Sequence, residues 1–141
     1  KITIITATYN SAKTIESCMT SVLNQSYPDI EYLIIDGAST DGTLKCIETF
    51  KQHHKNLVLT SEPDHGIYDA LNKGISKATG DIIGFVHSDD ILSNPNIVKI
   101  LLLILKKQIV MEYMVTWNML KKKIVIQYCD TGKVACLNQY C

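Results

Sequence analysis

Two adjacent carboxylates, Asp89 and Asp90, directly follow a short apolar run at residues 82–86 and are the strongest chemical feature of the sequence. Carboxylate oxygens are hard ligands of the kind that Mg²⁺ and Mn²⁺ prefer. A cation held by such a pair could bridge to a diphosphate. The alternative is that one of the two acids only caps a turn ahead of Pro95, and the dipeptide alone leaves both interpretations open.

An aromatic side chain, Tyr9, lies in the turn after the first apolar run, where residues 6–11 are T-A-T-Y-N-S. This turn has no G-x-G-x-x-G pattern. Asp36 could mimic the ribose-binding acid of a nicotinamide enzyme, but the missing pattern argues against a dinucleotide-binding dehydrogenase. Tyr9 could stack on a base, or it could be an aromatic residue at the rim of the core. The four histidines and five cysteines have neither H-E-x-x-H nor C-x-x-C spacing, which argues against a zinc site.

The elements that must position these residues alternate between strands and helices. Apolar, β-branched runs predict strands at residues 2–5, 31–35, 57–59 and 82–86. Apolar positions at helical spacing predict helices at 15–22, 44–50 and 67–78, with Ser11 as N-cap of the first and Gly80 as the C′ residue that closes the third. Because parallel neighbours need crossover connections, this order predicts an α/β fold with a mostly parallel sheet.

Polar residues stand where each predicted strand ends. They are Tyr9-Asn10, Asp36-Gly37, Ser61-Glu62 and the H-S-D-D segment at 87–90. Ligands of open α/β sheets bind outside the carboxyl ends of the strands. We therefore expect these residues to converge on one edge of the sheet and to form the binding site.

Five motifs occur in order within the first 98 residues. They are I-I-T-A-T-Y-N (4–10), S-V-L-N-Q-S-Y-P (21–28), I-I-D-G-A-S-T-D-G-T (34–43), D-H-G-I-Y-D-A-L-N-K-G (64–74), and G-D-I-I (80–83) followed by S-D-D (88–90). Together they resemble the successive signatures of family 2 glycosyltransferases, which have the GT-A fold. The fourth motif is similar to that of a subgroup acting in bacterial cell-surface polysaccharide synthesis.

This resemblance implies an inverting, metal-dependent transfer of a sugar from a nucleotide-sugar, with a UDP-sugar expected, to a saccharide or lipid-linked acceptor. It implies a divalent cation, Mn²⁺ or Mg²⁺, and no nucleic-acid partner. The leaving diphosphate gains negative charge, so a cation is its natural stabiliser. The resemblance implies that Asp90 binds the metal and that Asp89 binds the ribose. It implies that Thr8 and Tyr9 flank the nucleobase and that Asp36 lies beside it. It implies that Lys73 faces the ribose or the diphosphate.

The sequence departs from the family pattern at two positions. Many relatives have a second acid where this chain has Gly37, which leaves the identity of the nucleobase open, and His87 stands where an acid often begins the D-x-D-D form. Lys73 and Tyr68 also have structural alternatives, a solvated helix face for the lysine and a half-buried core edge for the tyrosine.

The charge of the chain is divided unevenly along it. The 141 residues carry 14 lysines and 14 acids in total. Seven lysines stand against twelve acids before residue 91, and seven against two after it. The sequence thus predicts a GT-A nucleotide-sugar-binding half at residues 1–98 and an atypical tail at 99–141. The resemblance implies that the catalytic general base is an acidic residue further downstream. Neither acid of the tail lies in a matching motif.

A change of reading frame near residues 105–110 is one hypothesis for this tail. Read one frame over, Met111-Glu112 must become Gly and Trp117-Asn118 must become Glu, and the codons allow a Y-G-D and a later R-x-W that resemble how these transferases continue. The alternative is a native, divergent tail that packs as a helix and a strand. The nucleotide sequence across residues 105–111 decides between them.

Two function classes follow from the sequence. The first is the donor-binding half of a cell-surface polysaccharide glycosyltransferase, cytoplasmic and peripheral at the inner face of the membrane. The apolar run at residues 100–105 is too short to cross a bilayer, which needs about 20 residues. The second is a non-catalytic nucleotide-binding or interaction fragment whose acid pair only caps a loop.

Overall fold

Strands and helices alternate along the chain, as the sequence predicts. The computed structural model describes residues 1–113, 124–128 and 134–137. The strands are β1 (Ile2–Thr8), β2 (Ile30–Asp36), β3 (Leu57–Ser61), β4 (Ile82–Phe85), β5 (Ile124–Tyr128) and β6 (Val134–Leu137). The helices are α1 (Ile15–Leu23), α2 (Thr43–Lys51), α3 (Ile67–Lys77) and α4 (Ile97–Tyr113).

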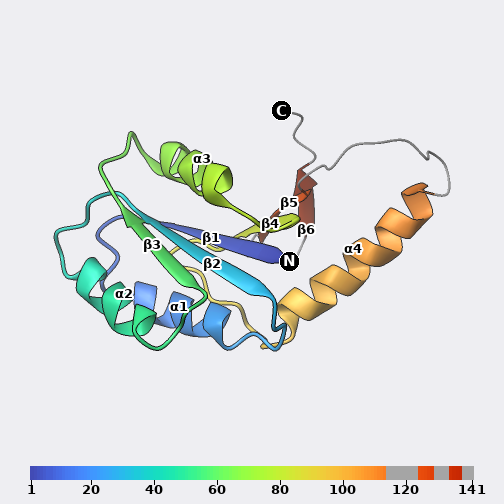
Figure 1. Ribbon diagram of the computed structural model, residues 1–141, viewed down its shortest axis with the longest axis horizontal. Helices are drawn as coiled ribbons and strands as arrows, with labels where there is room; N and C mark the ends of the chain where they lie inside the picture. Colours follow the sequence, from blue (N-terminus) through green and yellow to red (C-terminus); the bar gives the residue numbers. More distant parts are fainter. Residues whose placement is uncertain (114–123, 129–133, 138–141) are drawn as a thin grey trace.

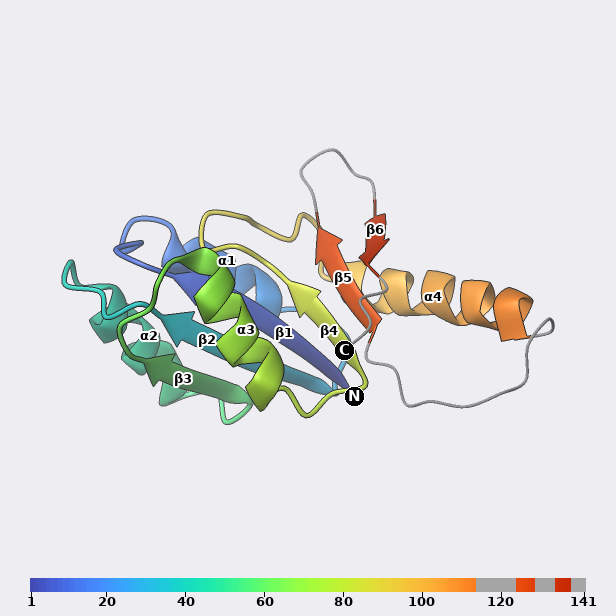
Figure 2. The same cartoon turned by 90° about the horizontal axis from the view of Figure 1, so that it is seen from above.

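The described strands form one sheet in the order β3-β2-β1-β4-β5-β6. Every neighbouring pair is parallel except β5 and β6. Helix α3 covers one face of the sheet, and α1 and α2 cover the other (Figure 1). Figure 2 shows the first four strands running in the same direction, with α3 lying over β1 and β2. The predicted α/β fold with a mostly parallel sheet is confirmed.

The central strands β1 and β2 are buried on both faces. Successive side chains of a strand point to opposite faces. Ile4 and Ile34 accordingly belong to the core beneath α1 and α2, whereas Ile5 and Ile35 belong to the core beneath α3. A sheet covered by helices on both sides has no polar face, which explains why these strands are nearly continuous apolar runs in the sequence.

The ends of two helices differ from the prediction. Helix α1 begins at Ile15, and Thr14, which makes no side-chain capping bond, is its N-cap. Ser11 acts instead through its carbonyl, which accepts hydrogen bonds from the backbone N of Thr14 and of Ile15 at 3.0 Å each. The C-cap of α3 is Ala78, so the C′ position falls on Thr79 rather than on Gly80.

Helix α4 leads away from the sheet (Figure 2). Val98 and Leu102, on its first two turns, join the core beneath α1. Within the described ranges, no helix is both long enough and apolar enough to cross a membrane. The residue pair Trp117-Asn118, which the reading-frame hypothesis uses, lies outside the described residues.

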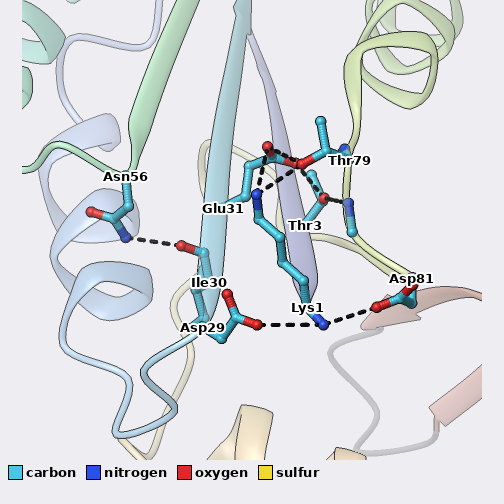
Figure 3. A network of polar contacts seen from close by, with 9 residues as sticks. Lys1, Thr3, Asp29, Ile30, Glu31, Asn56, Thr79 and Asp81 are labelled. Atoms are coloured by element: carbon cyan, nitrogen blue, oxygen red, sulfur yellow. Dashed lines mark hydrogen bonds and ion pairs between the residues drawn. The ribbon is translucent and has the colours of Figure 1, made fainter.

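A polar network at the amino-terminal edge of the sheet is centred on Glu31 of β2 (Figure 3). Thr3 Oγ1 donates to Glu31 Oε2 at 2.5 Å, and Thr79 donates through its backbone N at 2.8 Å and its Oγ1 at 2.6 Å. Lys1 Nζ lies 3.3 Å from Glu31 Oε1. Burial acts to raise the pKa of Glu31, but these hydrogen bonds outweigh it and lower the pKa from 4.5 to about 2.

We expect Glu31→Gln to lower the free energy of unfolding by about 1 to 2 kcal/mol near neutral pH. The amide carries no charge, and its NH₂ group is a hydrogen-bond donor where the carboxylate oxygen accepts hydrogen bonds from neighbouring donors. A carboxyl whose pKa is lower in the folded state stabilises the fold above its unfolded pKa, and this contribution is lost as pH falls through the folded value. Urea denaturation of both proteins should therefore give a difference that is constant above about pH 5 and shrinks between pH 4.5 and 2. A difference that stays constant down to about pH 2 would contradict the ionic role of Glu31.

Candidate functional site

The carboxyl ends of the strands lie side by side at one edge of the sheet. In the strand register, Thr8 of β1 is opposite Asp36 of β2, and Asp36 is opposite Ser61 of β3. Strand β4 is parallel to β1, so residues 87–90 leave the sheet at the same edge. The structure thus brings together the polar strand ends that the sequence predicted would converge.

A pocket of about 270 Å³ opens at this edge. Tyr9 stands at its rim with 61% of its surface exposed, whereas Thr8 is only 4% exposed. Thr8 Oγ1 is buried and has no hydrogen-bond partner among the described residues. Leaving a buried polar group unpaired costs about 1 to 3 kcal/mol. The unpaired hydroxyl therefore indicates that a ligand group forms its missing hydrogen bond. The pocket is lined by Ala7, Thr8, Tyr9, Ser11, Asp64, Gly66, Ile67, Ala70 and Ser88.

Asp36 lies fully buried at the end of β2. Its Oδ2 accepts hydrogen bonds from the Ser39 backbone N at 3.0 Å and from Ser61 Oγ at 2.7 Å. Its Oδ1 accepts one from Ser39 Oγ at 2.5 Å. The carboxylate therefore ties the loop after β2 to the end of β3, but Asp36 is not among the residues that line the pocket.

Lys73 of α3 is held by acidic and carbonyl oxygens. Its Nζ donates to the Pro63 carbonyl at 3.0 Å and lies 3.3 Å from both Glu62 Oε1 and Asp69 Oδ2. Desolvation acts to lower the pKa of Lys73, but the hydrogen bonds and charges of Asp69 and Glu62 outweigh it and raise the pKa. Lys73 thus anchors the segment that leads into α3, and that segment forms one wall of the pocket. Tyr68, by contrast, is 79% exposed, so its alternative as a half-buried core edge is wrong.

Asp89 and Asp90 stand on a turn after β4, in which the Asp90 backbone N donates to the His87 carbonyl at 3.0 Å. Ser88, the residue before them, lines the pocket, and its Oγ lies 3.0 Å from Ser11 Oγ. Within the described part of the chain, no hydrogen bond or ion pair engages either carboxylate.

These two carboxylates fit a cation that a ligand helps to hold. The described residues contain no group of three or more histidine, cysteine, aspartate or glutamate side chains placed to bind a metal by themselves. Mg²⁺ is usually held by one or two carboxylates, with substrate phosphates and waters completing its coordination. Asp89 and Asp90 supply acceptor oxygens of that kind beside a pocket.

A buried polar network that no sequence motif marks lies beneath the acidic turn. Thr6 Oγ1 donates to the Val86 carbonyl at 2.7 Å and lies 3.0 Å from the Tyr32 hydroxyl. Cys18 Sγ donates to the His87 carbonyl at 3.2 Å. Burial raises the pKa of the Cys18 thiol, and the charges of the two acids on the turn raise it further. The network fixes the backbone from which the turn departs.

The comparisons with known proteins identify the family of the chain. The profile of Glycosyl transferase family 2 matches residues 3–117. A PGL/p-HBAD biosynthesis glycosyltransferase of Mycobacterium tuberculosis is 37% identical over 90 residues, which are 63% of this chain and 35% of that protein. An uncharacterized glycosyltransferase of Haemophilus influenzae is 36% identical over 113 residues, which are 79% of this chain and 45% of that protein.

Solved structures give the same result. Residues 1–349 of Staphylococcus aureus TarS in complex with UDP-GlcNAc match with a TM-score of 0.70 and 29% identity, over 76% of this chain and 31% of that one. The mannosyltransferase PcManGT of Pyrobaculum calidifontis, in complex with GDP-Man and Mn²⁺, matches with a TM-score of 0.63 and 32% identity, over 67% of this chain and 29% of that one.

The fold is that of glycosyltransferases with the GT-A fold. The chain belongs to Glycosyl transferase family 2. It spans less than half the length of the relatives and solved structures that it matches.

Proposed function

We propose that residues 1–98 bind the nucleotide part of a nucleotide-sugar, a UDP-sugar in the first instance. The observation that carries the proposal is the unpartnered, buried hydroxyl of Thr8 in a pocket that Tyr9 and Ser88 also line. A nucleobase stacked on the exposed ring of Tyr9 would offer that hydroxyl a partner. The binding of UDP-GlcNAc by the similar TarS supports a sugar nucleotide as ligand.

We assign the rest of the donor to the residues around the pocket. Asp36 lies beside the base and acts through the serines that it holds. Asp89 binds the ribose, and Lys73 faces the ribose or the diphosphate. Lys73 Nζ can exchange one of its two carboxylate partners for a phosphate oxygen, since both lie at 3.3 Å.

Asp90 would hold a divalent cation, Mn²⁺ or Mg²⁺. When bound, the cation supplies charge that stabilises the diphosphate as it leaves the sugar. Two features of the chain favour Asp90 for this role. Asp90 is half-buried, and the turn that carries it is anchored from beneath by Thr6 and Cys18. A rigid backbone places a ligand without further ordering cost.

The whole protein, in this proposal, transfers the sugar with inversion to a saccharide or lipid-linked acceptor in cell-surface polysaccharide synthesis, at the cytoplasmic side of the membrane. We assign no general base within this chain. For the segment after residue 98, the reading-frame hypothesis stays a proposal, with a native tail as its alternative.

Calorimetric titration of the chain with UDP, with and without Mn²⁺, tests the proposed function. We expect saturable binding that strengthens when Mn²⁺ is added, because the carboxylate pair and the diphosphate each supply part of the coordination shell. Absent binding, or binding that Mn²⁺ leaves unchanged, would favour the non-catalytic interaction fragment. A donor-hydrolysis assay on the same sample then separates binding alone from turnover.

A further inference from the structure

We propose that Asp64 selects the nucleobase, by accepting the ring N–H of a base in which that N–H stands beside a carbonyl. Uracil and guanine carry this pair of groups, whereas cytosine and adenine present an acceptor nitrogen at the corresponding ring position. The proposal rests on the proposed function, since it assumes that the pocket of Thr8 and Tyr9 holds a base.

Asp64 lines the pocket, and only one of its two carboxylate oxygens accepts a hydrogen bond within the described residues. Its Oδ1 accepts a hydrogen bond from the Gly66 backbone N at 2.9 Å, directly before α3. Its Oδ2 accepts no hydrogen bond and joins no ion pair within the described residues. Lys73 holds the neighbouring Pro63 carbonyl at 3.0 Å, so the segment that carries Asp64 is anchored to α3. The free oxygen is thus a fixed acceptor.

The absence of a side chain at Gly37 makes room for this oxygen. A Cβ built on Gly37 would lie 2.7 Å from Asp64 Oδ2 and 3.3 Å from Tyr9 Cδ2. Contacts under 3.0 Å do not occur in practice, so any larger residue would displace the carboxylate or the ring. Asp64 Oδ2 and the edge of the Tyr9 ring therefore both lie against Gly37, which puts the acceptor at the side of the surface on which a base would stack.

The unpartnered Thr8 hydroxyl is an independent observation that points to the same ligand. Thr8 is 4% exposed, lines the same pocket, and its Oγ1 has no partner in the described part of the chain. A hydroxyl can donate to a carbonyl oxygen, whereas an ionised carboxylate can only accept. A donor from Thr8 and an acceptor from Asp64 complement a carbonyl next to a ring N–H. They mismatch cytosine and adenine, whose ring nitrogens would face the carboxylate with a lone pair.

The test is the base selectivity of Asp64→Asn, measured by calorimetry with UDP, GDP, CDP and ADP in the presence of Mn²⁺. Asparagine keeps the shape and the acceptor for Gly66, but it can turn its amide N–H₂ toward the base. We expect the ratio of UDP to CDP affinity to fall by about ten- to hundred-fold, the usual worth of a charge-assisted hydrogen bond. The UDP and GDP titrations identify which of the two suitable bases binds.

A second variant keeps the test decisive if the first folds poorly. Gly37→Asp combined with Asp64→Gly places a carboxylate on the neighbouring position, whose Cβ would lie 2.7 Å from the present Asp64 Oδ2, and should recover a preference for UDP over CDP. Gly37→Asp alone should weaken the binding of both nucleotides, because the two side chains collide.

Three results would overturn the proposal. If the unmodified chain binds UDP and CDP equally, or if Asp64→Asn lowers both affinities by the same factor, Asp64 does not read the base, while the proposed function stands. If the unmodified chain binds none of the four nucleotides, the proposed function fails and the role of Asp64 fails with it.

Discussion

Replacing Asp90 with alanine is expected to weaken the Mn²⁺-dependent binding of UDP by about 100-fold or more. Mutating a residue that only hydrogen-bonds to a metal ligand lowers metal affinity by about 10- to 100-fold, so removing a direct ligand should lower it at least as much. Without Mn²⁺ the variant and the unmodified chain should bind UDP alike. Calorimetry of both proteins, with and without the cation, measures the difference.

The matched control for this variant is Asp81→Ala. Asp81 precedes the same strand, β4, at the opposite edge of the sheet, and its side chain is 86% exposed. This variant should keep the full Mn²⁺ dependence. Asp90→Ala should unfold at the same temperature as the unmodified chain, because no described residue pairs with the Asp90 carboxylate. An unchanged Mn²⁺ dependence in Asp90→Ala would move the metal to other residues.

Replacing Gly74 with valine is expected to lower the free energy of unfolding by about 3 kcal/mol, the upper range for overpacking a core. A Cβ at this position would lie 2.6 Å from Ile5 Cγ2 and 3.3 Å from Ile35 Cγ1. Both isoleucines are buried on the central strands. Helix α3 must then move off the sheet, and the higher helix propensity of valine over glycine offsets only about half a kcal/mol of this cost.

The position of α3 also matters to the pocket, since Gly66, Ile67 and Ala70 line it. We therefore expect Gly74→Val to weaken UDP binding as well as stability. Asn72→Val is the matched control, because it introduces the same residue at an exposed position of α3. Urea denaturation gives the comparison, and a Gly74→Val protein within about 1 kcal/mol of the Asn72→Val control would contradict the close packing of α3.

The order of elements followed from the sequence because the local signals are strong. The run at residues 82–86 corresponds to β4, and the helical spacing at 67–78 corresponds to α3, at Ile67–Lys77. Boundaries followed less well, since they depend on tertiary bonds. Ser11 looked like an N-cap, but α1 starts at Ile15 and the Ser11 hydroxyl lies instead beside Ser88, which is 77 residues away in the sequence.

The sequence by itself determined the α/β order, the family motifs and the edge of the sheet at which the polar residues meet, because strand and helix periodicities are local and parallel strands end on the same side. It did not distinguish Asp36, whose oxygens are occupied by two serines, from Asp64, which has a free oxygen in the pocket. Only the tertiary structure decided that difference. Hydrogen-bond partners and the room beside Gly37 come from segments far apart in the chain, and no local pattern records them.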